Sequence, residues 1–183
     1  MAYALVVPEL VKRALGPADT SAAGDRVRGR ELALAVGAGL ALTFALAHGA
    51  DLFFETGAEL ARCVGRLDTE SRRLLDQKGA ALTRALAAAR ASTPLVVMAA
   101  AVVPFAEERV YRGLLLPVLS RRYGATYGLF ASSVVFGLAH FGVYQLALYQ
   151  TVLLGLAFGV AYFEGGLLAA FVVHGVWNLV QLA

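Results

Sequence analysis

The chain has 183 residues, of which 59% are hydrophobic and only 16% are charged. A soluble domain of this length needs more polar surface than this, so a membrane protein with several spans is predicted. The formal net charge of +3 is too small to indicate nucleic-acid binding, and the single cysteine excludes an intrachain disulfide framework.

The first half of the chain alternates apolar and charged stretches. Residues 1–16 are interpreted as a short interfacial helix, and residues 17–30 as a polar linker that contains several arginines. Residues 32–46 form the first candidate span, with an extension at the carboxyl end to reach the ~20 residues that a crossing needs. Residues 55–92 carry charges among leucines at helical spacing, which predicts one or two amphipathic helices on the membrane or against the core.

The second half is almost entirely apolar, so we divide the chain into an amino-terminal region, 1–92, and a membrane core, 93–183. Within the core Pro104 should interrupt the first span, and the short turns between the later spans imply antiparallel neighbours. The sequence therefore predicts an all-α fold, a polytopic transmembrane helical bundle with about five spans plus amphipathic helices. The four spans expected in the core are residues 94–119, 125–141, 146–163 and 167–182.

Two adjacent carboxylates interrupt the apolar sequence of the second span. Ionisable groups at that depth are costly, and their default interpretation is functional. At helical spacing Glu108 and Arg112 lie four residues apart on one face and can form an ion pair, whereas Glu107 points about 140° away from Arg112. Glu107 is thus the carboxylate that is left available as a general base towards a water molecule.

Two further polar residue pairs lie in later spans, and each pair shares one helix face. Phe136 and His140 are four residues apart, as are His174 and Asn178. Arg121, Gly124 and Gly166 mark the helix ends on one side of the membrane. Counted from these ends at about 1.5 Å per residue, Glu107, His140 and Asn178 lie at about 18–24 Å, and His174 lies at about 12 Å. We therefore expect one cavity inside the membrane, nearer the opposite face.

The ordered set Glu107-Glu108-x-x-x-Arg112, Phe136-x-x-x-His140 and His174-x-x-x-Asn178 resembles the three motifs of the CPBP family. That family comprises type II CAAX prenyl endopeptidases, bacterial relatives linked to bacteriocin processing and immunity, and sorting proteases such as the myxosortases. The resemblance covers about residues 93–183. It implies that this part of the chain is the catalytic core of an intramembrane glutamate endopeptidase.

The resemblance also implies a role for each residue. Glu107 with His140 would activate the water that attacks the scissile carbonyl, while His174 and Asn178 would stabilise the oxyanion. The Glu108 and Arg112 pair would support the site. The implied partners are a membrane-associated protein or peptide substrate and the lipid bilayer, without a cofactor, and the expected location is the cell membrane, as a multi-pass protein of a bacterial inner membrane.

Membrane orientation gives an expectation about the substrate. The arginines before the first span and Arg121-Arg122 after the second are best placed in the cytoplasm, so the site should open towards the outer face. An outward site suits a protease that trims carboxy-terminal sorting segments, as the myxosortases do, better than one that acts on cytosolic prenylated tails.

Three other interpretations of the same residues compete with this one. Glu107, His140 and His174 have the composition of a catalytic zinc site, although no His-Glu-x-x-His helix is present. A membrane immunity protein, partner-binding protein or proton-coupled carrier could use them as a hydrogen-bonded relay. A serine mechanism at Ser132-Ser133 is disfavoured, because such hydroxyls usually bond to backbone carbonyls one turn back.

Overall fold

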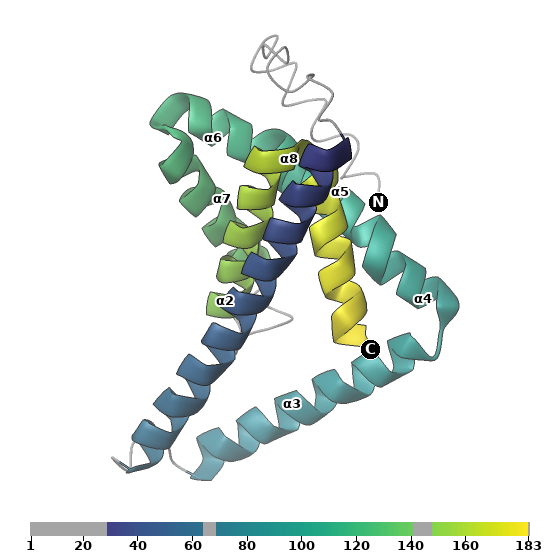
Figure 1. The fold of residues 1–183 in the computed structure, drawn as a ribbon. Coiled ribbons are helices and arrows are strands. Elements are labelled where there is room, and N and C mark those ends of the chain that lie inside the picture. Colours follow the sequence, from purple (N-terminus) through teal and green to yellow (C-terminus); the bar gives the residue numbers. More distant parts are fainter. Residues whose placement is uncertain (1–28, 64–68, 141–147, 183) are drawn as a thin grey trace.

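The computed structural model describes residues 29–63, 69–140 and 148–182, and these form helices. Helix α2 (Gly29–Cys63) is the longest single rod in Figure 1, and it passes the two arms of α8 (Leu148–Leu182) before it extends beyond them. Helix α3 (Thr69–Arg90) returns at an angle towards the carboxyl end of α8. The expected amphipathic region, 55–92, therefore begins as the last turns of α2 and continues as α3.

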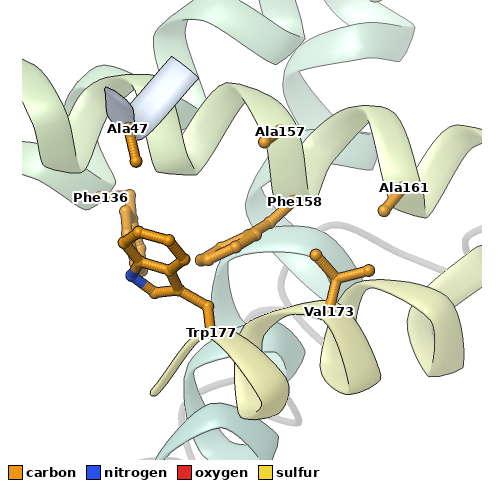
Figure 2. Close-up of a cluster of buried hydrophobic side chains, with 7 residues drawn as sticks. All are labelled: Ala47, Phe136, Ala157, Phe158, Ala161, Val173 and Trp177. Carbon is orange, nitrogen blue, oxygen red and sulfur yellow. The ribbon is translucent and has the colours of Figure 1, made fainter. Parts of the chain in front are cut away.

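The core forms where small residues let α2 approach α8 closely. A methyl group on Gly39 would lie 2.9 Å from a Val173 methyl and 3.0 Å from Ala161 Cβ, so these two helices are in direct contact. Figure 2 shows the apolar cluster around this contact, in which Phe158 and Trp177 extend from the two arms of α8 towards Phe136. The division at residue 92 stays a prediction, although α2 contributes Ala47 to this cluster.

The segment Thr93–Tyr123 is one continuous run of helix that widens twice, each time just ahead of a proline. Its parts in order are α4 (Thr93–Val97), the π-helical turn η2 (Met98–Val102), α5 (Val103–Val110), the π-helical turn η3 (Tyr111–Leu115) and α6 (Leu116–Tyr123). A proline ring clashes with the carbonyl four residues back and offers no N–H, and a wider turn relieves that clash. The expected interruption at Pro104 therefore takes the form of a π-turn.

Two glycines with positive φ make the sharp reversals of the second half. Gly124 (φ 92°) separates α6 from α7 (Ala125–Ala139), and Gly166 (φ 71°) divides α8 into two arms. Only glycine adopts such angles without strain. The turn at Gly166 lies against the start of α2, since a methyl on Gly165 would come within 2.7 Å of Ala35 Cβ. The two arms of α8 and α7 consequently run side by side (Figure 1).

The number of membrane spans is lower than the five predicted. In the described part of the chain two helices, Gly29–Gly49 of α2 and Leu148–Leu182, are long and apolar enough to cross a membrane. A third is obtained if Thr83–Arg90 and Thr93–Tyr123, which are bent by 109°, count as one span. The predicted fourth and fifth spans are the arms of α8, and the 15 residues of α7 give only about 22 Å of helix, short of the ~30 Å hydrocarbon core.

Other predictions have mixed outcomes. The hydroxyls of Ser132 and Ser133 both donate to the carbonyl oxygen of Leu129, at 3.1 and 2.7 Å, as expected of serines in apolar helices. The interfacial helix at 1–16, the linker up to residue 28 and the turn at Gly142 lie outside the described residues.

Candidate active site

A buried ion pair lies behind the site. Arg112 Nη1 donates to Glu108 Oε1 at 3.0 Å, and both side chains are buried, with 1% and 0% of their surface exposed. Arg112 Nη2 donates to the carbonyl oxygen of Gly155 at 2.8 Å. The pairing predicted from the four-residue spacing is therefore confirmed, and its arginine also holds the first arm of α8.

Aromatic rings complete the surroundings of that arginine. The Arg112 guanidinium carbon lies 4.7 Å from the ring centre of Phe136, which is within the range of a cation–π contact. The Phe158 ring stacks on His174 with centroids 4.5 Å apart and an interplanar angle of 18°. These rings keep water away from Glu108 and Arg112, so each of these two charges is stabilised mainly by the other.

Glu107 lies between two imidazoles, and about a quarter of its side chain is exposed. Its Oε1 is 3.6 Å from His140 Nε2, and its Oε2 is 3.7 Å from His174 Nε2. Both separations exceed a direct hydrogen bond, and polar groups at such a distance are commonly bridged by water. The carboxylate thus faces one ring nitrogen on each side.

The second nitrogen of each imidazole is held by an acceptor. His140 Nδ1 lies 2.7 Å from the carbonyl oxygen of Phe136, and His174 Nδ1 lies 2.8 Å from Glu108 Oε1. A carbonyl or carboxylate oxygen can only accept, so both Nδ1 atoms carry hydrogen. This fixes the orientation of both rings and directs each Nε2 towards Glu107.

A cavity of about 430 Å³ opens in front of these groups. All four residues predicted as catalytic line it: Glu107 from α5, His140 from the end of α7, and His174 and Asn178 from the second arm of α8. Its remaining wall is mostly apolar and includes Leu86 of α3, which places α3 beside the opening. A mostly apolar cavity with a few converging polar groups is the usual form of a ligand site.

Three polar residues of the cavity were not predicted from the sequence: Gln150, Thr151 and Gln181. Gln181 lies seven residues after His174 and therefore on the same face of its helix, which is a signal that the sequence contained. Gln150 stands at the start of the first arm, where a glutamine resembles an ordinary helix-end residue.

The structure does not separate the two histidines in the way the motif roles predict. His140 was assigned to Glu107 and His174 to the oxyanion, yet their distances to Glu107 differ by only 0.1 Å. They differ in what lies behind them, because His174 alone contacts the ion pair. Within the described residues, no group of three or more His, Cys, Asp or Glu side chains is arranged to hold a metal ion.

Comparison with known protein families decides the class of this site. The family model "Type II CAAX prenyl endopeptidase Rce1-like" matches residues 89–180, which contain all seven named residues of the three motifs. The chain belongs to this family. No curated protein and no solved structure matches it.

Membership in the Rce1-like family settles the general activity. The chain is a CAAX-type intramembrane endopeptidase, a hydrolase that acts on membrane-associated protein substrates, and it is a multi-pass membrane protein. The family confirms the predicted resemblance and favours the enzyme over a non-enzymatic immunity or carrier protein.

Proposed function

We propose that this Rce1-like protein hydrolyses a peptide bond near the carboxy-terminal end of its substrate, with a water molecule activated by Glu107 and His140. The observation that carries the proposal is the position of the Glu107 carboxylate on the wall of the cavity, between the Nε2 atoms of two oriented imidazoles. A carboxylate flanked in this way is suited to take a proton from water.

The reaction then needs no group beyond those of the chain and one water molecule. The water oxygen bonds to the scissile carbonyl carbon as Glu107 accepts one water proton. The C–N bond then breaks as Glu107 passes this proton to the nitrogen of the leaving amine, and the new carboxyl group keeps the water oxygen. His140 hydrogen-bonds the same water. The carbonyl oxygen, as it becomes negative, accepts from the second N–H of Asn178 and from His174 Nε2. Because the Nδ1 hydrogen of His174 is already directed at Glu108, donation from Nε2 requires this imidazole in its doubly protonated form.

The direction of the cavity bears on the substrate. Helix α6, which ends in the basic residues Arg121-Arg122, and the start of α2 lie at the same end of the bundle (Figure 1). The cavity is lined by residues near the carboxyl end of α8, which points towards the other end. With the basic end in the cytoplasm, the cavity opens towards the outer face of a bacterial inner membrane. We propose that it trims carboxy-terminal sorting segments, as myxosortases do.

Mass spectrometry of membrane-protein carboxy termini tests this proposal. Cells with the wild-type protein are compared with cells that carry Glu107→Gln at the same protein level. We expect a set of shortened carboxy termini in the first sample that are full length in the second. Identical termini in both samples would contradict the proposed reaction, and the cut positions would identify the bond.

The zinc alternative makes a different prediction for the purified protein. Because the proposed reaction uses Glu107 as the base and not as a ligand, we expect peptide cleavage to continue at an unchanged rate after dialysis against a strong chelator. Loss of cleavage on chelation, with recovery on addition of Zn²⁺, would instead establish a metalloprotease that uses Glu107, His140 and His174 as ligands.

A further inference from the structure

The helix that carries Glu107 contains a carbonyl oxygen without a donor from its own helix. In an α-helix Ala99 O would accept from the N–H of Val103, but that N–H donates to Met98 O across the π-turn. In π-helical spacing the donor would be the nitrogen of Pro104, which has no hydrogen. Ala99 O must therefore find its donor elsewhere, because an unpaired buried carbonyl is costly.

Asn178 supplies that donor from the neighbouring helix. Its Nδ2 donates to Ala99 O at 2.8 Å across 79 positions of sequence. One turn earlier on the same helix, a methyl group on Gly175 would lie only 2.5 Å from Ala100 O. Two consecutive carbonyls of η2 thus lie against one face of the second arm of α8. Ala99 O accepts from the Asn178 amide, and Ala100 O packs against Gly175.

This contact joins the helix that carries Glu107 to the helix that carries His174. Pro104 is three residues before Glu107, and Asn178 is one turn after His174. A hydrogen bond between these turns sets how far α5 lies along α8, and hence the separation of 3.7 Å between Glu107 and His174. This contact would therefore fix the position of the Glu107 carboxylate within the site. That position matters for the reaction, because a misplacement of about 1 Å can lower a rate by ~10²-fold.

We propose that Asn178 is a positioning residue, whose amide binds the carbonyl that Pro104 leaves unpaired and so holds Glu107 in register with His174. Its effect on the reaction rests on the proposed function, whereas its effect on helix packing does not. The motif residue Asn178 then has a partner, Pro104, outside the three motifs. The pair should behave as one unit under mutation.

A double-mutant cycle on the full chain in detergent tests the pair. In the wild-type background, Asn178→Ala should lower the midpoint of thermal unfolding by about 5 °C and lower kcat about 10-fold or more with little change in KM. Pro104→Ala restores an N–H ahead of Glu107, and in that background Asn178→Ala should shift the midpoint by no more than about 1 °C. Equal shifts in both backgrounds would overturn the proposal.

A second variant keeps the test decisive if Pro104→Ala fails to fold. Asn178→Asp has nearly the same shape but sets a carboxylate oxygen against Ala99 O, so it should lower the unfolding midpoint at least as much as Asn178→Ala. Gln181→Ala, which removes another amide of the cavity wall one turn on, is the control and should leave the midpoint unchanged. A stable Asn178→Asp protein would refute the positioning role.

The unfolding measurements also separate this proposal from the proposed reaction. If the wild-type protein cleaves no substrate, the reaction is wrong, yet the midpoints still report on the contact between Asn178 and Ala99. If Asn178→Ala loses cleavage with unchanged midpoints in both backgrounds, the reaction stands and the positioning role fails.

Discussion

Glu107→Gln should lower the rate of peptide cleavage by about 10²–10⁴-fold, the contribution expected of a general base. Glutamine fills the same volume between His140 and His174, but its amide cannot accept a proton from water. The protein should therefore stay folded while it loses turnover. The measurement is the initial rate of cleavage of a peptide that carries one of the processed termini.

Glu164→Gln is the matched control for this replacement. Glu164 is an exposed carboxylate at the turn between the arms of α8, outside the cavity wall. Its replacement removes the same charge from the same chain and should leave the rate unchanged. A Glu107→Gln protein that keeps more than about a tenth of the wild-type rate would show that another group activates the water.

Arg112→Met should be among the most destabilising single replacements in the chain. It removes the partner of a carboxylate that has no exposed surface, and breaking a buried pair from one side costs about 3–5 kcal/mol. For a chain of this size we expect a fall of about 10 °C in the midpoint of thermal unfolding. The hydrogen bond to Gly155 and the contact with the Phe136 ring are lost as well.

Two further variants separate the lost charge from the lost volume. Arg109→Met removes an arginine three residues away, whose guanidinium contacts the Phe105 ring, and should change the midpoint by no more than about 2 °C. Glu108→Gln combined with Arg112→Met removes both charges, so it should be more stable than Arg112→Met alone. If Arg112→Met and Arg109→Met unfold at the same temperature, the buried pair contributes nothing to stability.

Much of the site follows from one-turn spacing within single helices. Glu108 and Arg112 were expected to pair because residues four apart share a helix face, and they do. The same spacing brings Phe136 O to the ring of His140. Counting residues from the helix ends predicted that the polar residues of three helices lie at a similar depth in the membrane. Glu107, His140 and Asn178 do line one cavity.

The partners supplied by the backbone could not be predicted in this way. Gly155 O accepts from Arg112, and Ala99 O accepts from Asn178. A carbonyl has no sequence signature, because each residue carries one. The π-turns add a second difficulty, since each inserts an extra residue that rotates the following helix by about 100° relative to α-helical counting.

The number of spans was wrong for a related reason. Apolar composition shows that residues 146–163 and 167–182 are buried or lie in lipid, but it does not show how many times they cross the membrane or that Gly166 joins them directly as the two arms of α8. A hydropathy pattern likewise does not predict the angle of 109° between Thr83–Arg90 and Thr93–Tyr123. The boundary expected near residue 55 was wrong, because α2 continues to Cys63 without a stop signal.

The break at Gly166 has a mechanical consequence for the entry of a polypeptide. The second arm of α8 carries His174, Trp177 and Asn178, and its first residue follows a glycine held close to α2 through Gly165 and Ala35. Asn178 lies about 18 Å along the helix from this pivot, so a rotation of about 10° would displace it by about 3 Å. A small torsional change at one backbone position would thus separate Asn178 from Ala99 O and widen the far end of the cavity, while the end at Gly166 stays in place.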